Sequence, residues 1–224
     1  MFPTISISSD LEKHARWARF MAADQVPFAT ALALTRTAQD AEKELTAELP
    51  RQLDKPTPFT MRAWGVSKAT KKALTAAVYA KDAQAKYLRW QVYGGQRAPA
   101  RVSQKLPTAI KVNEFGNIPK GEIARLVKLA QEGKRLTRAR ARRLGVSNQV
   151  ELFYGDPGEG RPAGVYKRVQ QGAEHHLVPL VVFPRVPAQY RPRLPMQAIV
   201  ERVVRARFGA NYRDAWAQAL RSAR

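Results

Sequence analysis

A dense group of basic side chains lies between residues 134 and 143, where six of the ten positions are Lys or Arg. Cations at this density repel one another unless they lie in solvent or against an anion, and Lys and Arg are almost never buried unpaired. Two interpretations stay open: a sequence-independent contact with nucleic acid, or a contact with an acidic protein. We predict that replacing Arg138, Arg140, Arg142 and Arg143 with Gln leaves the fold intact. The candidate contact residues are Lys134, Arg135, Arg138, Arg140, Arg142 and Arg143.

The stretch from Leu136 to Ser147 resembles the first helix and turn of a helix-turn-helix DNA reader. That motif needs a second helix of about two or three turns for the major groove. Only Asn148 to Tyr154 remain before the glycine-rich loop, and Val150, Leu152 and Tyr154 alternate as in a strand. The sequence therefore favours a strand here, and disfavours sequence-specific reading of DNA.

Three other groups of residues could carry chemistry, and none has the required pattern. The loop from Gly155 to Arg161 lacks the Gly-Lys-Ser/Thr ending of a phosphate loop and leads into a proline, so we predict a strand connection. Adjacent His175 and His176 would point to opposite faces of a strand and could not easily share a metal ion. With no cysteine in the chain, we nominate no catalytic, metal-binding or cofactor-binding residue and expect no enzyme.

Four aromatic residues, Trp64, Tyr79, Tyr87 and Trp90, occur at strand or helix spacing. Aromatic rings can stack on nucleic-acid bases, but at this spacing they more often fill a core. We therefore predict core packing for all four.

The chain has 224 residues, with 39 Lys and Arg against 18 Asp and Glu, a net charge of +21. This charge predicts a polyanionic partner. The hydrophobic fraction of 45% is sufficient for folding, and no apolar run of membrane-spanning length occurs. The opening residues lack the pattern of a secretory signal, so we expect a protein made in the cytoplasm that does not enter a membrane.

The apolar periodicity predicts an α+β fold with an antiparallel β-sheet, a long N-terminal helix, further amphipathic helices and C-terminal helices. We expect a single domain over 1–224, with a basic loop or arm near 96–112 and a C-terminal helical segment over 195–224. Helices are predicted over 11–21, 27–49, 84–92, 121–132, 196–208 and 212–220, and strands over 59–66, 74–79, 149–154, 164–170 and 177–183.

Several separated blocks together resemble the tail-completion or neck proteins of tailed phages similar to the minor tail protein Z of lambdoid phages. The first is a valine-proline entry into an alanine-rich helix over 26–38, where Thr35 replaces an asparagine common in the family. The others are Pro56 to Thr60 with the basic hairpin after it, Phe115 to Gly121 before a helix, and Gly164 to Arg168 with Leu177 to Phe183 and Tyr190-Arg191.

This resemblance implies a structural virion protein that completes the neck or tail and joins head to tail as a multi-copy ring subunit. It implies neck, portal or adaptor, and tail proteins as partners, self-association in a ring around the DNA channel, and no catalytic residues. The proline-rich link from Phe183 to Met196 suits docking of a neighbour, because fixed proline dihedrals lower the entropy lost on binding. By hypothesis, its docking residues are Tyr190, Arg191 and Arg193. The alternative is a non-specific nucleic-acid-binding protein, inside a virion or in a bacterium.

Overall fold

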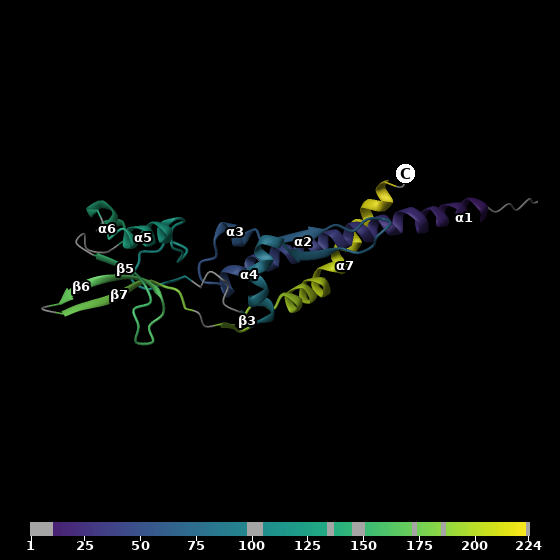
Figure 1. Cartoon of the computed structure of the whole chain (residues 1–224). Coiled ribbons are helices and arrows are strands. Elements are labelled where there is room, and N and C mark those ends of the chain that lie inside the picture. The colour runs from purple at the N-terminus through teal and green to yellow at the C-terminus, as the bar shows by residue number, and fades with distance from the viewer. Residues whose placement is uncertain are drawn as a thin grey trace, which may run out of the picture. The chain divides into compact units, whose positions relative to one another are not determined.

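The computed structural model describes residues 11–97, 105–133, 137–144, 151–171, 174–184 and 187–222. The predicted α+β class is confirmed, with long helices beside antiparallel strands (Figure 1). The described chain divides into two compact units where we predicted one domain. Unit 1 takes residues 11–53, 58–92 and 193–222, and unit 2 takes 54–57 and the described part of 93–192. Each unit has hydrophobic clusters of its own.

Unit 1 begins with a continuous helical path, where we predicted two separate helices. Helix α1 (Leu11–Phe20) leads through a π-helical turn, η1 (Met21–Gln25), into α2 (Val26–Gln52). Pro27 has no N–H and its ring crowds the carbonyl four residues back, which would break a regular α-helix. The wider π turn accommodates it, and the Val26 N–H bonds to the Met21 carbonyl, five residues back. Pro50 was predicted to end the helix, but α2 continues to Gln52.

Helix α7 (Met196–Ser222) is a single helix of 27 residues that packs antiparallel to α2, as Figure 1 shows. The predicted division between residues 208 and 212 is wrong. Asn211 bonds to α2 within the expected gap, its Nδ2 donating to Thr37 Oγ1 at 3.1 Å and to Asp40 Oδ2 at 3.0 Å. At one end of the pair, four fully buried alanines bring the helices close together: Ala29, Ala33, Ala215 and Ala219.

The predicted hairpin is confirmed with shorter strands, β1 (Trp64–Ser67) and β2 (Ala77–Ala80), and it packs on α2. This is an antiparallel sheet against the long N-terminal helix, as predicted. A helical turn, α3 (Pro58–Met61), precedes β1, and α4 (Asp82–Tyr93) follows β2 where a helix was expected. Their shared core contains Leu45, Leu49, Trp64, Leu88, Leu194 and Ile199.

Unit 2 contains a four-stranded antiparallel sheet in the order β4 (Leu106–Pro107), β7 (Glu174–Val182), β6 (Gly164–Gln171) and β5 (Glu151–Gly155). Strands β5, β6 and β7 confirm the three predicted strands, and α5 (Glu122–Gln131) confirms the amphipathic helix. Helix α5 packs against the sheet through Leu126, which is buried with Leu152, Val165, Leu180 and Val181.

The expected arm over 96–112 is in part built into this unit. Strand β3 (Gly95–Arg97) pairs with β8 (Ala188–Tyr190), and β4 (Leu106–Pro107) pairs with β7. Ile110 is buried in the unit-2 core, so the segment that follows β4 packs against that unit. Residues 98–104 lie outside the described part, and the arm stays a prediction there.

Candidate functional site

The basic run predicted from the sequence lies in part on helix α6 (Arg138–Leu144). The side chains of Arg138, Arg142 and Arg143 lie on the surface. Lys134 and Arg135 fall outside the described residues, as does the side chain of Arg140. Strand β5 begins at Glu151, so the described part of the interval after α6 is a strand, as predicted, and does not support groove reading.

Arg143 differs from its neighbours because it binds a buried carboxylate. Its Nη2 lies 2.7 Å from Glu122 Oε2, and the Glu122 side chain is 1% exposed. Arg125 adds a longer ion pair with the same oxygen at 4.0 Å. Glu122 also stands in the first turn of α5, where a negative charge offsets the helix dipole. Arg143 therefore has a structural task, which leaves Arg138 and Arg142 as the described cations of the run that could meet an external anion.

The three residues assigned to partner docking are divided between the units. Tyr190 pairs with Gly95 in the β3–β8 ladder, and Arg191 follows it with an exposed side chain in unit 2. Arg193 belongs to unit 1, where its N–H bonds to the Gln91 carbonyl at 2.7 Å while its side chain is exposed. These positions leave two exposed arginines, and the docking assignment stays a prediction.

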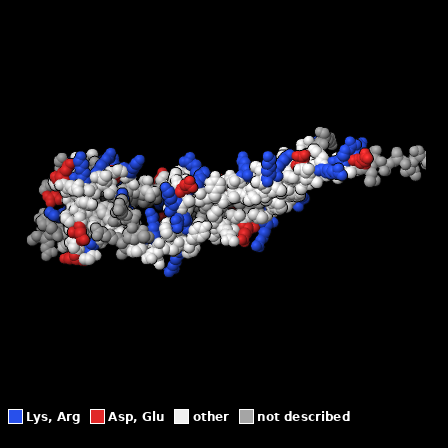
Figure 2. Space-filling view, turned by 45° about the vertical axis from the view of Figure 1, so that its right-hand side comes forward, with Lys and Arg blue, Asp and Glu red and all other residues white. Residues whose placement is uncertain are grey.

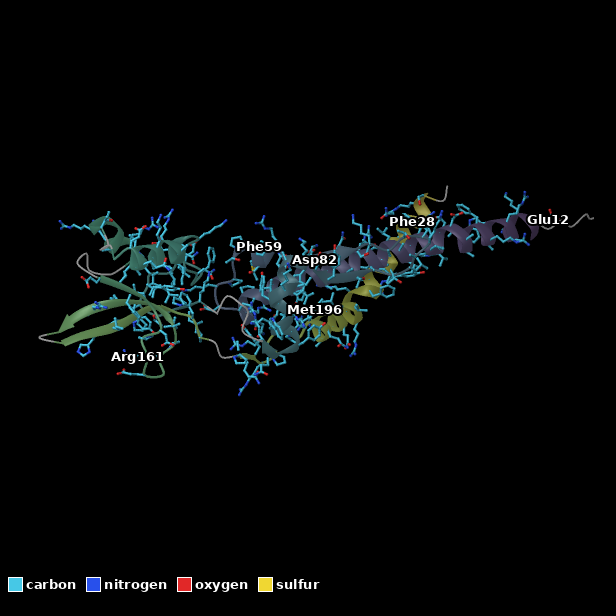
Figure 3. The ribbon with its side chains drawn as sticks, in the orientation of Figure 1. Glu12, Phe28, Phe59, Asp82, Arg161 and Met196 are labelled. Atoms are coloured by element: carbon cyan, nitrogen blue, oxygen red, sulfur yellow. The ribbon has the colours of Figure 1, made fainter. Side chains whose placement is uncertain are left out.

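A second basic surface, which the sequence reasoning did not nominate, lies on the β1–β2 hairpin and α4. Between residues 62 and 89 the only acidic residue is Asp82, which Figure 3 labels on α4. Figure 2 shows Lys and Arg side chains projecting along the face of unit 1 in view. The near absence of acidic residues was the available sequence signal. The cations are Arg62, Lys68, Lys71, Lys72, Lys81, Lys86 and Arg89.

The aromatic residues of this region do not all fill the core as predicted. Trp64 is 2% exposed, in agreement with the prediction, but Tyr79 is 50% exposed. Tyr79 lies opposite Gly65 in the β1–β2 register. Its neighbours on β2, Val78 and Ala80, pack against the core, so strand alternation puts Tyr79 on the opposite face, where its ring lies over Gly65. The core prediction for Tyr79 is therefore wrong.

The remaining candidates are the glycine-rich loop, metal-ligating groups and pockets. The loop after β5 connects it to β6 as predicted, and Asp156 Oδ1 accepts from the Gly158 N–H at 2.9 Å within that loop. No group of three metal-ligating side chains occurs in the part of the chain that the structure describes. A pocket of about 370 Å³ beside the start of α5 has two titratable residues, Lys105 and Lys120, among the described residues that line it. Among the described helices, none combines the length and apolarity of a membrane span.

Burial perturbs one tyrosine in unit 2. Burial raises the pKa of Tyr166 above its ordinary value of 10.0. Its hydroxyl donates to the Pro162 carbonyl at the end of the β5–β6 loop. The phenol is thus held in its neutral form as a structural anchor for that loop.

The described surface offers exposed cations, which can bind anions, and exposed aromatic side chains, which can contact apolar partners. Comparison with protein-family models, with curated proteins and with solved structures finds no match to this chain.

Proposed function

We propose that this chain is a structural virion protein of a tailed bacteriophage, completing the neck or tail as a multi-copy ring subunit that joins head to tail. Three features support the proposal. They are the resemblance of the separated blocks to neck and tail-completion proteins, the net charge of +21, and an exposed amphipathic helix. The partners would be neck, portal or tail proteins and further copies of the chain, and the location would be the virion.

Helix α1 is the observation that carries the proposal. Each of its described side chains is exposed, including Trp17 at 58% and Phe20 at 41%. His14, Trp17, Ala18 and Met21 follow helical spacing along one face, and Met21, at 5% exposure, is where that face becomes buried. Helix α1 is continuous through η1 with α2, so its exposed side chains are held in a regular helical array. Its uncovered aromatic side chains are typical of a surface that a neighbouring protein buries.

The test is made in a phage that encodes the chain. Without the protein, capsids should form but few infectious particles should result, with heads and tails unjoined or DNA poorly retained. Electron microscopy of particles with an infectivity titre measures both. Neighbouring capsid, portal or tail genes would add support, and normal particles at normal titre would end the proposal.

A matched pair of variants then tests the role of α1. Trp17→Ser with Phe20→Ser should reproduce the loss, because the exposed aromatic groups are removed and the helical body of unit 1 is untouched. Ala15→Ser on the same helix is the control and should give normal particles. Equal titres for the two variants would show that α1 is not an assembly contact.

A second candidate function is non-specific nucleic-acid binding. The observation that favours it is the basic surface of the hairpin and α4, where Asp82 is the only acidic residue between 62 and 89. A protein that shifts DNA with a steep salt dependence, yet never enters particles, would favour this candidate over the first.

A further inference from the structure

The ring of Tyr79 has one face against the backbone and the other toward solvent. A Cβ placed on Gly65 would lie 2.8 Å from Tyr79 Cζ, 3.0 Å from Oη and 3.1 Å from Cε2. Two ring carbons and the hydroxyl oxygen at nearly equal distances, with Cζ nearest, place one face of the phenol end of the ring over Gly65. Half of the residue remains exposed. A rigidly seated aromatic ring with a free face is the form that stacks on a nucleic-acid base.

Cations stand at both ends of the strand that carries Tyr79. Lys81 follows Tyr79 by two residues, and its Nζ donates to the Arg62 carbonyl at 2.9 Å, which brings Lys81 to the segment of Arg62. Both side chains are exposed. At the other end, the loop between β1 and β2 carries Lys68 and Lys72, also exposed.

That loop is held in place along α2 and η1. The Ala69 N–H donates to Thr35 Oγ1 at 3.1 Å, and Lys71 Nζ lies 3.3 Å from Asp24 Oδ1. Lys71 Nζ also lies 5.8 Å from the centre of the Phe28 ring, labelled on α2 in Figure 3. Because Lys71 is engaged in this anchoring, Lys68 and Lys72 are the loop cations that can meet an external anion.

The combination of a free ring face and flanking cations selects one class of ligand. Acidic peptides would satisfy the cations but would leave the ring unused. Duplex DNA would also satisfy the cations, but its bases are already stacked on one another. A single strand offers both phosphates for the cations and an unpaired base for the ring.

We infer that the outward side of the β1–β2 hairpin, centred on Tyr79 and flanked by Arg62, Lys68, Lys72 and Lys81, binds a single-stranded segment of nucleic acid. A base stacks on the free face of Tyr79, and the four cations neutralise phosphates on either side of it. Gly65 is a positioning residue, because only glycine lets the ring lie flat. The inference gives the second candidate function a site and does not rest on the neck proposal.

The test is fluorescence anisotropy of the full chain with a labelled oligo-dT of about 16 nucleotides, a length that spans one such site. A duplex of the same length is the second probe. The wild-type chain should bind oligo-dT more tightly than the duplex at low salt. Tyr79→Ala should weaken oligo-dT binding about tenfold or more. The salt slope, which is the slope of the logarithm of the binding constant against the logarithm of the salt concentration, should stay unchanged. Tyr79→Trp should retain binding. Gly65→Ala should weaken binding by displacing the ring.

The second part of the test removes cations. The double variant Lys68→Gln with Lys72→Gln should lower the magnitude of the salt slope for oligo-dT by about 1.4. The control is Arg207→Gln with Arg213→Gln, which removes the same charge from two exposed cations on α7 and should leave a larger slope than the Lys68 and Lys72 variant.

Circular dichroism shows whether each variant is folded, and Tyr79→Trp keeps the test valid if Tyr79→Ala unfolds. The inference is overturned by a folded Tyr79→Ala that binds oligo-dT like the wild type. Preference for the duplex, or no binding at about 50 mM salt, would also overturn it. Particle assembly by Tyr79→Ala remains a separate readout of the neck proposal.

Discussion

Arg143 reaches from α6 to Glu122 in the first turn of α5, with Nη2 and Oε2 2.7 Å apart, and fixes the two helices to each other. The carboxylate is 1% exposed while the Arg143 side chain is 61% exposed, so the pair joins a buried charge to a surface cation. Removing the cation from such a pair costs far more than removing an unpaired surface cation, because a buried charge loses its short ion pair.

We predict that Arg143→Gln lowers the free energy of unfolding of unit 2 by about 2 kcal/mol, the usual worth of a hydrogen bond to a charged group. Arg142→Gln, one residue away and exposed, should change it by less than about 0.5 kcal/mol. Urea unfolding followed by circular dichroism compares them. Equal midpoints would contradict the structural role of Arg143. The sequence predicts that Arg138, Arg140, Arg142 and Arg143 can be replaced with the fold intact, and the ion pair with Glu122 removes Arg143 from that expectation.

Two glycines should respond to Ala in opposite directions. At Gly164 an added Cβ would lie 2.4 Å from the Val181 carbonyl oxygen and 3.2 Å from Val182 Cα, so β6 and β7 would have to separate. We predict that Gly164→Ala destabilises unit 2 by about 3 kcal/mol or more. At Gly209, inside α7, the nearest atom is Arg213 Nη1 at 3.9 Å, and Gly209→Ala should stabilise by about 0.5 to 1 kcal/mol. Thermal melts decide both, and a neutral Gly164→Ala would show that the strands can adapt.

Asn211 should matter to the α2–α7 pair because its amide donates two hydrogen bonds across the interface, to Thr37 and Asp40. We predict that Asn211→Ala lowers the free energy of unfolding of unit 1 by about 1 to 2 kcal/mol. Gln218→Ala removes an exposed bond from Arg36 in the same helix pair and should cost less than about 0.5 kcal/mol. Chemical denaturation of the two variants provides the comparison, and equal losses would show that burial does not decide the effect.

Stability should fall in strongly alkaline solution as Tyr166 ionises. Burial raises the pKa of Tyr166 above 10.0, so between the unfolded and folded pKa the unfolded state loses the proton first. The stabilisation is complete below pH 10 and is lost as the pH rises through the folded pKa. Tyr166→Phe should remove this part of the pH dependence, measured as unfolding midpoints at a series of pH values. A wild-type curve parallel to that of Tyr166→Phe above pH 10 would contradict the assignment.

The sequence predicted those elements whose periodicity is local. Helix α5 and strands β5, β6 and β7 lie where apolar alternation or helical spacing placed them, because each buries one continuous face. The β1–β2 hairpin was found for the same reason, although Phe59 and Met61 belong to a helical turn.

What the sequence did not predict depends on partners distant along the chain. Gly209 and Pro27 are local helix breakers, but α7 continues because Asn211 bonds to α2, and the π turn accommodates Pro27. Tyr79 is exposed because Val78 and Ala80, its neighbours on β2, face the core, and the spacing alone does not say which face of a strand is buried. Arg143 looked like its neighbours because its carboxylate partner is 21 residues away.

The π turn at Met21–Gln25 also sets an angle. Five residues wound at about 4.4 per turn rotate less than the same residues in an α-helix, so everything upstream is turned about the axis by roughly 90° from its regular phase. The direction in which α1 presents Trp17 is therefore determined at η1 and not within α1. Removing one residue from η1 would restore α-helical phase, keep every side chain of α1, and aim Trp17 at a different sector of the surroundings.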